Sequence, residues 1–257
     1  MKSKILIGLL FVLGGCLPNN NPVTDISQED SLHASIEYSP PVQLIEEVYL
    51  SEDFTLDSIS YTDHEHHIYC LAEIPKTAFP TFNVFIDKRF TEIQKIMYAR
   101  AEKRQWGIKE AFANDPDNLE EELSKLCSFD FHPQAIYQDA TCISIRFWAT
   151  WLEQSFHGLP EYYTVNFDKE TLTEIYFEDY FHLSSAQDSL LLLALINEGL
   201  QNPHLSIKEV YPVKFNIEGD SISFNFDAYE LEAYAYGMPR AYVSKIKLGH
   251  LIHERFQ

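Results

Sequence analysis

Apolar side chains alternate strictly along two neighbouring segments, and this pattern narrows the choice of folds. In residues 143–151 every second side chain is apolar, and the same period returns in residues 163–167. Successive side chains of a β-strand point to opposite faces, so the pattern predicts strands with one face in a core. Asp168-Lys169-Glu170-Thr171 then predicts a turn to a strand over residues 172–177. The alternating residues are Ile143, Ile145, Phe147, Ala149, Trp151, Tyr163, Val165 and Phe167.

Further strands are predicted on both sides of these two. They cover residues 44–50, 55–61, 67–74 and 129–139, and Pro75 is expected to end the third. A hairpin is predicted around Glu218-Gly219-Asp220, between the apolar pairs of residues 215–217 and 222–226.

Helical spacing appears in four places. Phe82, Ile86, Phe90, Ile93 and Met97 recur every three or four residues after Pro80, with Asn83 as the expected cap. An acidic helix is predicted over residues 119–126, after a loop at residues 115–118. A third helix is capped by Ser184 or Ser185 and buries Leu190, Leu193, Ile196, Asn197 and Leu200. A last helix starts near Ser244 and buries Ile246, Leu251 and Ile252.

The fold class expected from these elements is α+β, with antiparallel sheets and interposed helices in two lobes. The first lobe is assigned to residues 42–135 and the second to residues 136–257.

The N-terminus predicts export and lipidation. Two lysines precede the uncharged apolar run of residues 5–13, which is typical of a signal peptide and too short to span a bilayer. Leu13-Gly14-Gly15-Cys16 resembles the lipobox of bacterial lipoproteins, so residues 1–15 are expected to be removed and Cys16 to carry lipid. Residues 16–41 are polar and predict a flexible tether. We therefore expect a cell-envelope protein at the outer membrane or cell surface.

The formal net charge of −20 limits the classes of partner. Nucleic acid and bare anionic lipid attract basic patches, so neither is expected, whereas a basic protein or a cation would be attracted. Acidity that only keeps an exported protein soluble explains the charge equally well. Cys70, Cys127 and Cys142 can form at most one internal disulfide. Cys70 and Cys142 lie in strand-like runs, and burial as small apolar residues is the other reading of these two.

No sequence pattern identifies a metal, a cofactor or a catalytic centre. In His64-Glu65-His66-His67, two histidines have the i, i+2 spacing that zinc sites use, but no third ligand is evident, and a polar turn between strands is expected there. Nucleotide-binding glycine loops and nucleophile elbows do not occur. Asp168, Asp227 and Glu230 are the acids that an enzyme acting on peptidoglycan or polysaccharide would use.

The most unusual stretch is rich in tyrosine. Tyr229, Glu230, Tyr234, Tyr236 and Gly237 fall in nine residues. Exposed tyrosines favour binding, because each supplies a large rigid area and a polar tip, but tyrosines at a sheet edge or in a core fit the pattern equally well.

Residues 221–237 resemble the extracytoplasmic region of the anti-sigma factor RsiV, which ends in a strand, a Tyr-Glu pair and a Tyr-Ala-x-Gly turn before a closing helix. Tyr163-Thr164-Val165-Asn166-Phe167-Asp168 and Asp179-Tyr180-Phe181 are similar to two other motifs of that family. The first lobe is similar to a domain that PdaC-type peptidoglycan deacetylases share. The resemblance implies an envelope module without catalysis of its own, and in RsiV this region binds lysozyme.

The function expected is thus a lipid-anchored binding protein, without cofactor, whose ligand is lysozyme, another basic protein or a cell-wall fragment. The alternatives are the carboxylate-dependent enzyme and a purely structural envelope component. No transmembrane or sigma-binding segment is evident in the sequence, so no anti-sigma role is expected.

Overall fold

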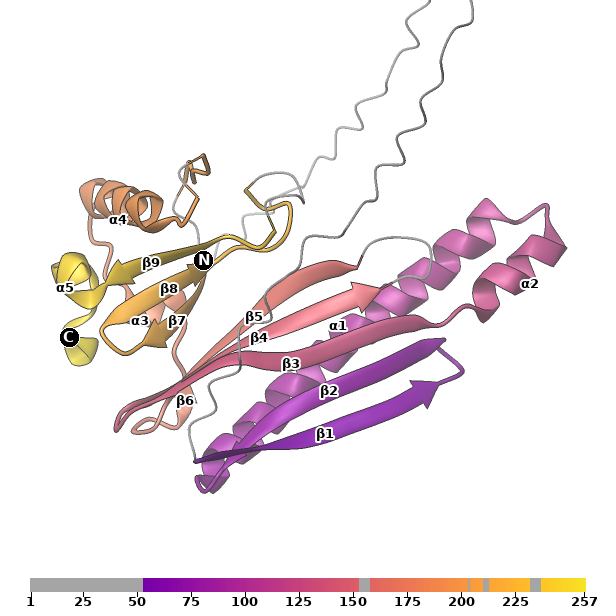
Figure 1. The fold of residues 1–257 in the computed structure, drawn as a ribbon, viewed down its shortest axis with the longest axis horizontal. Helices are drawn as coiled ribbons and strands as arrows, with labels where there is room; N and C mark the ends of the chain where they lie inside the picture. The colour runs from indigo at the N-terminus through magenta and orange to yellow at the C-terminus, as the bar shows by residue number, and fades with distance from the viewer. Residues whose placement is uncertain (1–52, 153–157, 203, 210–212, 232–236) are drawn as a thin grey trace, which may run out of the picture. The chain divides into compact units, whose positions relative to one another are not determined.

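The computed structural model describes residues 53–257 apart from 153–157, 203, 210–212 and 232–236 (Figure 1). The signal peptide, Cys16, the tether and the strand predicted over residues 44–50 lie outside the described residues. The expected α+β class is confirmed, because the described chain forms two sheets, largely antiparallel, with helices between their strands.

The larger sheet has six strands in the order of the chain. Neighbouring strands are antiparallel except β2 and β3, which pair in parallel from Ile68 opposite Cys127 to Ala72 opposite Phe131. The connection between these two contains α1 (Pro80–Ala111) and α2 (Pro116–Ser124). The strands are β1 (Phe54–Asp63), β2 (Ile68–Thr77), β3 (Cys127–Gln138), β4 (Cys142–Leu152), β5 (Leu159–Asp168) and β6 (Thr173–Glu174).

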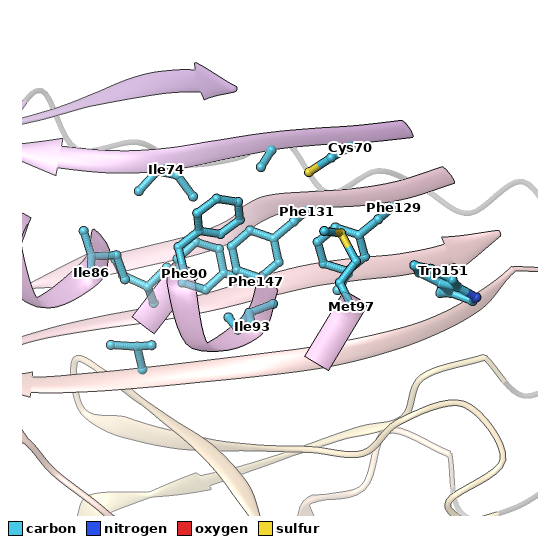
Figure 2. Close-up of a cluster of buried hydrophobic side chains, with 14 of the residues drawn as sticks. Cys70, Ile74, Ile86, Phe90, Ile93, Met97, Phe129, Phe131, Phe147 and Trp151 are labelled. Carbon is cyan, nitrogen blue, oxygen red and sulfur yellow. The ribbon is translucent and has the colours of Figure 1, made fainter. Parts of the chain in front are cut away.

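Helix α1 covers one face of this sheet, and its predicted apolar stripe is confirmed. All five predicted residues are buried, and Figure 2 shows Phe90, Ile93 and Met97 directed at the aromatic side chains of β3 and β4. The rings of Phe131 and Phe147 stack with centroids 4.5 Å apart. This aromatic layer fixes which side of α1 is buried and which side faces outward.

Two local predictions in this region were wrong. Asn83 is not the cap of α1, because the helix begins at Pro80 and the Asn83 amide instead bonds the backbone N–H and carbonyl of Thr77 at 3.0 and 2.9 Å. Pro75 does not end β2, which continues to Thr77. The pairing of β2 with β3 stops at Ala72, so the missing N–H of Pro75 removes no bond to β3.

The turn segments also differ in detail from prediction. The loop expected at residues 115–118 is largely helical, since Asp115 caps α2 and Pro116 occupies its first position. The strand expected over residues 172–177 is reduced to the two residues of β6, and α3 (Phe177–Tyr180) begins at the residue where that strand was expected to end.

The smaller sheet consists of β7 (Lys214–Glu218), β8 (Ser221–Asn225) and β9 (Arg240–Ser244). The predicted hairpin is confirmed, and Gly219 at its tip has a φ of +60°. Ser185 caps α4 (Ala186–Gly199) as predicted, and Ser244 caps α5 (Lys245–Leu248). Two short 3-10 helices, Gly249–Leu251 and Glu254–Phe256, end the chain.

Some predicted burial in this region was wrong, although Ile196 and Leu251 are buried as expected. Leu190 is 63% exposed and Ile246 is 90% exposed, because α4 turns Leu192 inward and the one-turn helix α5 turns Leu248 inward. Strand β9 was not predicted at all.

A buried polar cluster joins the two sheets. The Ser144 hydroxyl of β4 donates to Asn166 Oδ1 of β5 at 2.7 Å, and Asn166 Nδ2 donates to the Phe215 carbonyl of β7 at 2.9 Å. Nearby, Arg146 forms an ion pair with Glu218 at 2.8 Å. Strand β4 is therefore buried on both faces along its first half. The lobe boundary suggested at residues 135–136 falls inside β3.

Candidate binding surface

The tyrosine-rich segment begins and ends at a closed base. The Phe226 N–H donates to the Pro239 carbonyl at 3.1 Å, and the Phe226 side chain is fully buried in the core of the smaller sheet. This bond defines the 227–238 loop. The described ends of the loop, residues 227–231 and 237–238, are therefore held together at a buried anchor.

Asp227 ties this loop to the larger sheet. Its Oδ1 accepts a hydrogen bond from the Tyr162 N–H of β5 at 2.7 Å, and its other oxygen forms an ion pair with Lys214 at the start of β7. Beside it, Arg100 of α1 bonds Glu161 at 2.6 Å. The base of the 227–238 loop thus lies where α1, β5 and β7 contribute alternating charges.

The structure places three of the predicted binding residues on this loop. Tyr229 is 57% exposed and has a φ of +68°, a left-handed conformation that costs a non-glycine residue about 1 kcal/mol. Glu230 is exposed, and its carboxylate accepts the Asp227 N–H at 2.7 Å. Gly237 has a φ of +70°, which favours glycine. Tyr234 and Tyr236 lie outside the described residues.

The acids of the alternative enzymatic reading do not share one site. Asp227 and Glu230 are neighbours, but Asp227 bonds the start of β5 whereas Asp168 ends the same strand, about 20 Å away at the usual rise per residue. Burial acts to raise the pKa of Asp168, but hydrogen bonds from the Thr171 and Glu170 backbone and the charge of Arg255 lower it. Asp168 therefore serves as an ionised turn cap.

The histidine cluster forms the turn between β1 and β2. Asp63 Oδ1 accepts the N–H groups of Glu65 and His66 at 2.9 and 3.0 Å, and its Oδ2 lies 3.0 Å from His66 Nδ1. Residue His67 has a φ of +55°. Within the described residues no group of three or more histidine, cysteine or acidic side chains is arranged to hold a metal.

A cavity that the sequence did not suggest lies beside the C-terminus. It has a volume of about 370 Å³ and is lined by acids of the β5–α3 region together with His253, Arg255 and Phe256. Burial raises the pKa of one of these acids, Glu174, although Arg89 lies 3.4 Å away. The lining acids are Asp168, Glu174, Glu178 and Asp179.

None of the three cysteines of the described chain is in a disulfide, and all are buried. Burial raises the pKa of Cys142 to about 12. These cysteines therefore belong to the core, as one reading of the sequence proposed for Cys70 and Cys142.

Two crystal structures of DUF3298 family proteins are similar to this fold. One is from Pseudomonas aeruginosa PAO1, with a TM-score of 0.52, 13% identity, and coverage of 78% of this chain and 94% of that one. The other is from Bacteroides fragilis NCTC 9343, with a TM-score of 0.55, 11% identity, and coverage of 79% and 94%. The chain shares the fold of DUF3298 family proteins.

At these identities the likeness concerns the fold, not the ligand. No protein-family model matches the sequence, and no curated protein matches it either. Among the described helices none is both long and apolar enough to cross a membrane.

Proposed function

We propose that this chain is a lipid-anchored binding protein of the bacterial envelope that binds a basic protein, such as lysozyme, without catalysis of its own. The anchor is the lipid on Cys16, and the location is the outer membrane or cell surface. The RsiV-like motifs and the lipobox support this proposal, and the shared DUF3298 fold is compatible with it.

The observation that carries the proposal is the 227–238 loop with Tyr229 exposed on a closed base. A rigid, exposed tyrosine loses little conformational entropy on binding and often dominates the energy of an interface. Glu230 places a negative charge next to it, and the chain as a whole is strongly acidic. Complementary charge speeds association with a basic partner and makes the complex sensitive to salt.

The test is a titration of the processed chain with lysozyme by calorimetry, at low and at high ionic strength. We expect a complex that weakens as salt is added, and a Kd about tenfold higher for Tyr229→Ala, in the range of interface anchors. Tyr176→Ala is the matched control, because Tyr176 is 55% exposed and follows β6, which pairs with the end of β5 whereas Asp227 bonds Tyr162 near its start. No interaction at low ionic strength would remove lysozyme as the ligand.

Lipidation is tested separately. Mass spectrometry of the native protein should give a chain that starts at Cys16 with acyl groups attached, and Cys16→Ser should abolish both processing and labelling by fatty acid. An unmodified chain that starts at Met1 would contradict the anchor.

A further inference from the structure

The basic residues of this acidic chain are unevenly distributed. The chain has a net charge of −20, yet α1 contains seven lysines or arginines and four acidic residues, a net charge of +3. The charge of the whole chain predicts repulsion from anionic surfaces. Helix α1 is an exception to that prediction, provided that several of its basic side chains share one exposed face.

Three of the seven, all lysines, share a face, and it is the face turned away from the sheet. At 100° per residue, Val84, Lys88, Lys95, Trp106 and Lys109 fall within about 60° of one another. The buried stripe of α1 lies on the opposite side of the helix. We call these five residues the outer α1 face. One carboxylate, that of Glu102, falls in the same sector.

The outer α1 face is exposed and its charges are available. Trp106 is 65% exposed and Val84 is 72% exposed, and all three lysines are exposed. Within the described residues none of the three lysines forms an ion pair with a carboxylate. By contrast, Arg89 and Arg100 on the flanks of the helix are paired with acids.

Unpaired lysines beside an exposed tryptophan suit the boundary between water and an anionic bilayer. Each lysine near such a surface contributes about 1 kcal/mol, and tryptophan is favoured at the level of the lipid headgroups. The lysine stems also lie along apolar surface while their ammonium groups reach the phosphates.

We infer that the outer α1 face docks on anionic phospholipid and so orients the anchored chain on its membrane. This inference rests on the lipid anchor of the proposed function, which keeps the face at a high effective concentration near the bilayer. The rest of the chain is acidic and is repelled by the same surface. Docking therefore selects one orientation, with the outer α1 face toward the lipid.

The experiment uses the chain as purified in its processed form, mixed with phosphatidylcholine vesicles with or without phosphatidylglycerol. Flotation with the vesicles measures anchoring of the chain by its lipid. Quenching of tryptophan fluorescence by brominated lipid measures docking of the outer α1 face. We expect flotation on both vesicles but quenching on the anionic ones, with quenching lost at high salt. Trp106→Phe should remove the quenching, since Trp148 and Trp151 belong to the sheet.

The charge test is the triple variant Lys88→Gln, Lys95→Gln, Lys109→Gln. Its docking constant on anionic vesicles should fall about 100-fold, from three lysine contributions. The matched control changes Lys208, Lys245 and Lys247 to Gln, which alters the net charge equally and should leave quenching intact.

The outcomes separate the two proposals. A chain that fails to float on neutral vesicles contradicts the anchor and not the docking face. A chain that floats on anionic vesicles without quenching overturns the docking inference. Equal loss of quenching in both triple variants, or binding of soluble polyphosphate with no response to vesicles, overturns it as well.

Discussion

Asp139 caps the turn between β3 and β4, and its replacement gives a measurable prediction. Its Oδ1 accepts the N–H groups of Thr141 at 2.7 Å and Cys142 at 2.8 Å, and Tyr137 donates to Oδ2 at 3.2 Å. Burial acts to raise the pKa of Asp139, but these hydrogen bonds outweigh it and lower the pKa from 3.8 to about 2. The folded state thus favours the ionised carboxylate.

The shift sets the size of the effect. At about 1.4 kcal/mol per pKa unit, ionisation of Asp139 stabilises the folded chain by about 2 kcal/mol at pH 7. Because the folded-state pKa is the lower one, this contribution is complete above about pH 5 and falls as the pH drops toward 2. At pH 3 the ionisation of Asp139 still contributes about half of the stabilisation that it contributes at pH 7.

Asp139→Asn keeps an oxygen acceptor and removes the charge. Its free energy of unfolding should be about 2 kcal/mol below that of the unmodified chain at pH 7, and about half as far below at pH 3. Urea unfolding followed by tryptophan fluorescence measures both values. Asp57→Asn, on an exposed β1 residue, is the control and should differ little. A deficit that stays the same at both pH values would refute the electrostatic reasoning.

Three further predictions concern packing, the junction of the sheets and the thiols. Gly199→Ala would place a Cβ 2.5 Å from the Tyr242 carbonyl oxygen and should lower the free energy of unfolding by about 1–3 kcal/mol, as measured by calorimetry. Gly107→Ala is the contrast, because a Cβ there meets nothing within 4 Å and should raise the free energy of unfolding by up to about 1 kcal/mol. Asn166→Ala should cost about 2 kcal/mol in urea unfolding, because its hydrogen-bond partners between the sheets stay buried without it; an unchanged midpoint would contradict this. The three buried thiols should react with a thiol reagent at pH 8 only after denaturant is added, and rapid labelling of the folded chain would contradict their burial.

The periodic spacing of apolar residues predicted those helices and strands that bury one face and expose the other. The spacing of Phe82 to Met97 placed α1 correctly, because a helix against a sheet buries one stripe and exposes the rest. Ser185 and the Glu218-Gly219-Asp220 turn were readable because a cap and a tight turn depend on neighbouring residues.

Burial created by distant segments could not be read in the same way. Ser144 and Arg146 look like outward residues of an alternating strand, but β7, about 70 residues later, covers them. The bond from Tyr162 to Asp227 also joins segments far apart in the sequence. Composition therefore indicated the tyrosine-rich loop, but the hydrogen bonds that hold its base could be found only in the tertiary structure.

The parallel pairing of β2 with β3 has a consequence for how the chain folds during synthesis. Strands β1 and β2 and helix α1 leave the ribosome well before β3, because they precede it in the chain. Ile68 of β2 can therefore pair with Cys127 of β3 only after the whole connection has been synthesised. Until then β2 lacks one neighbour, and α1 has only the β1–β2 hairpin to cover. Closing so long a connection makes the joining of the hairpin to β3 a late, slow step, and the nascent chain is most exposed to aggregation in that interval.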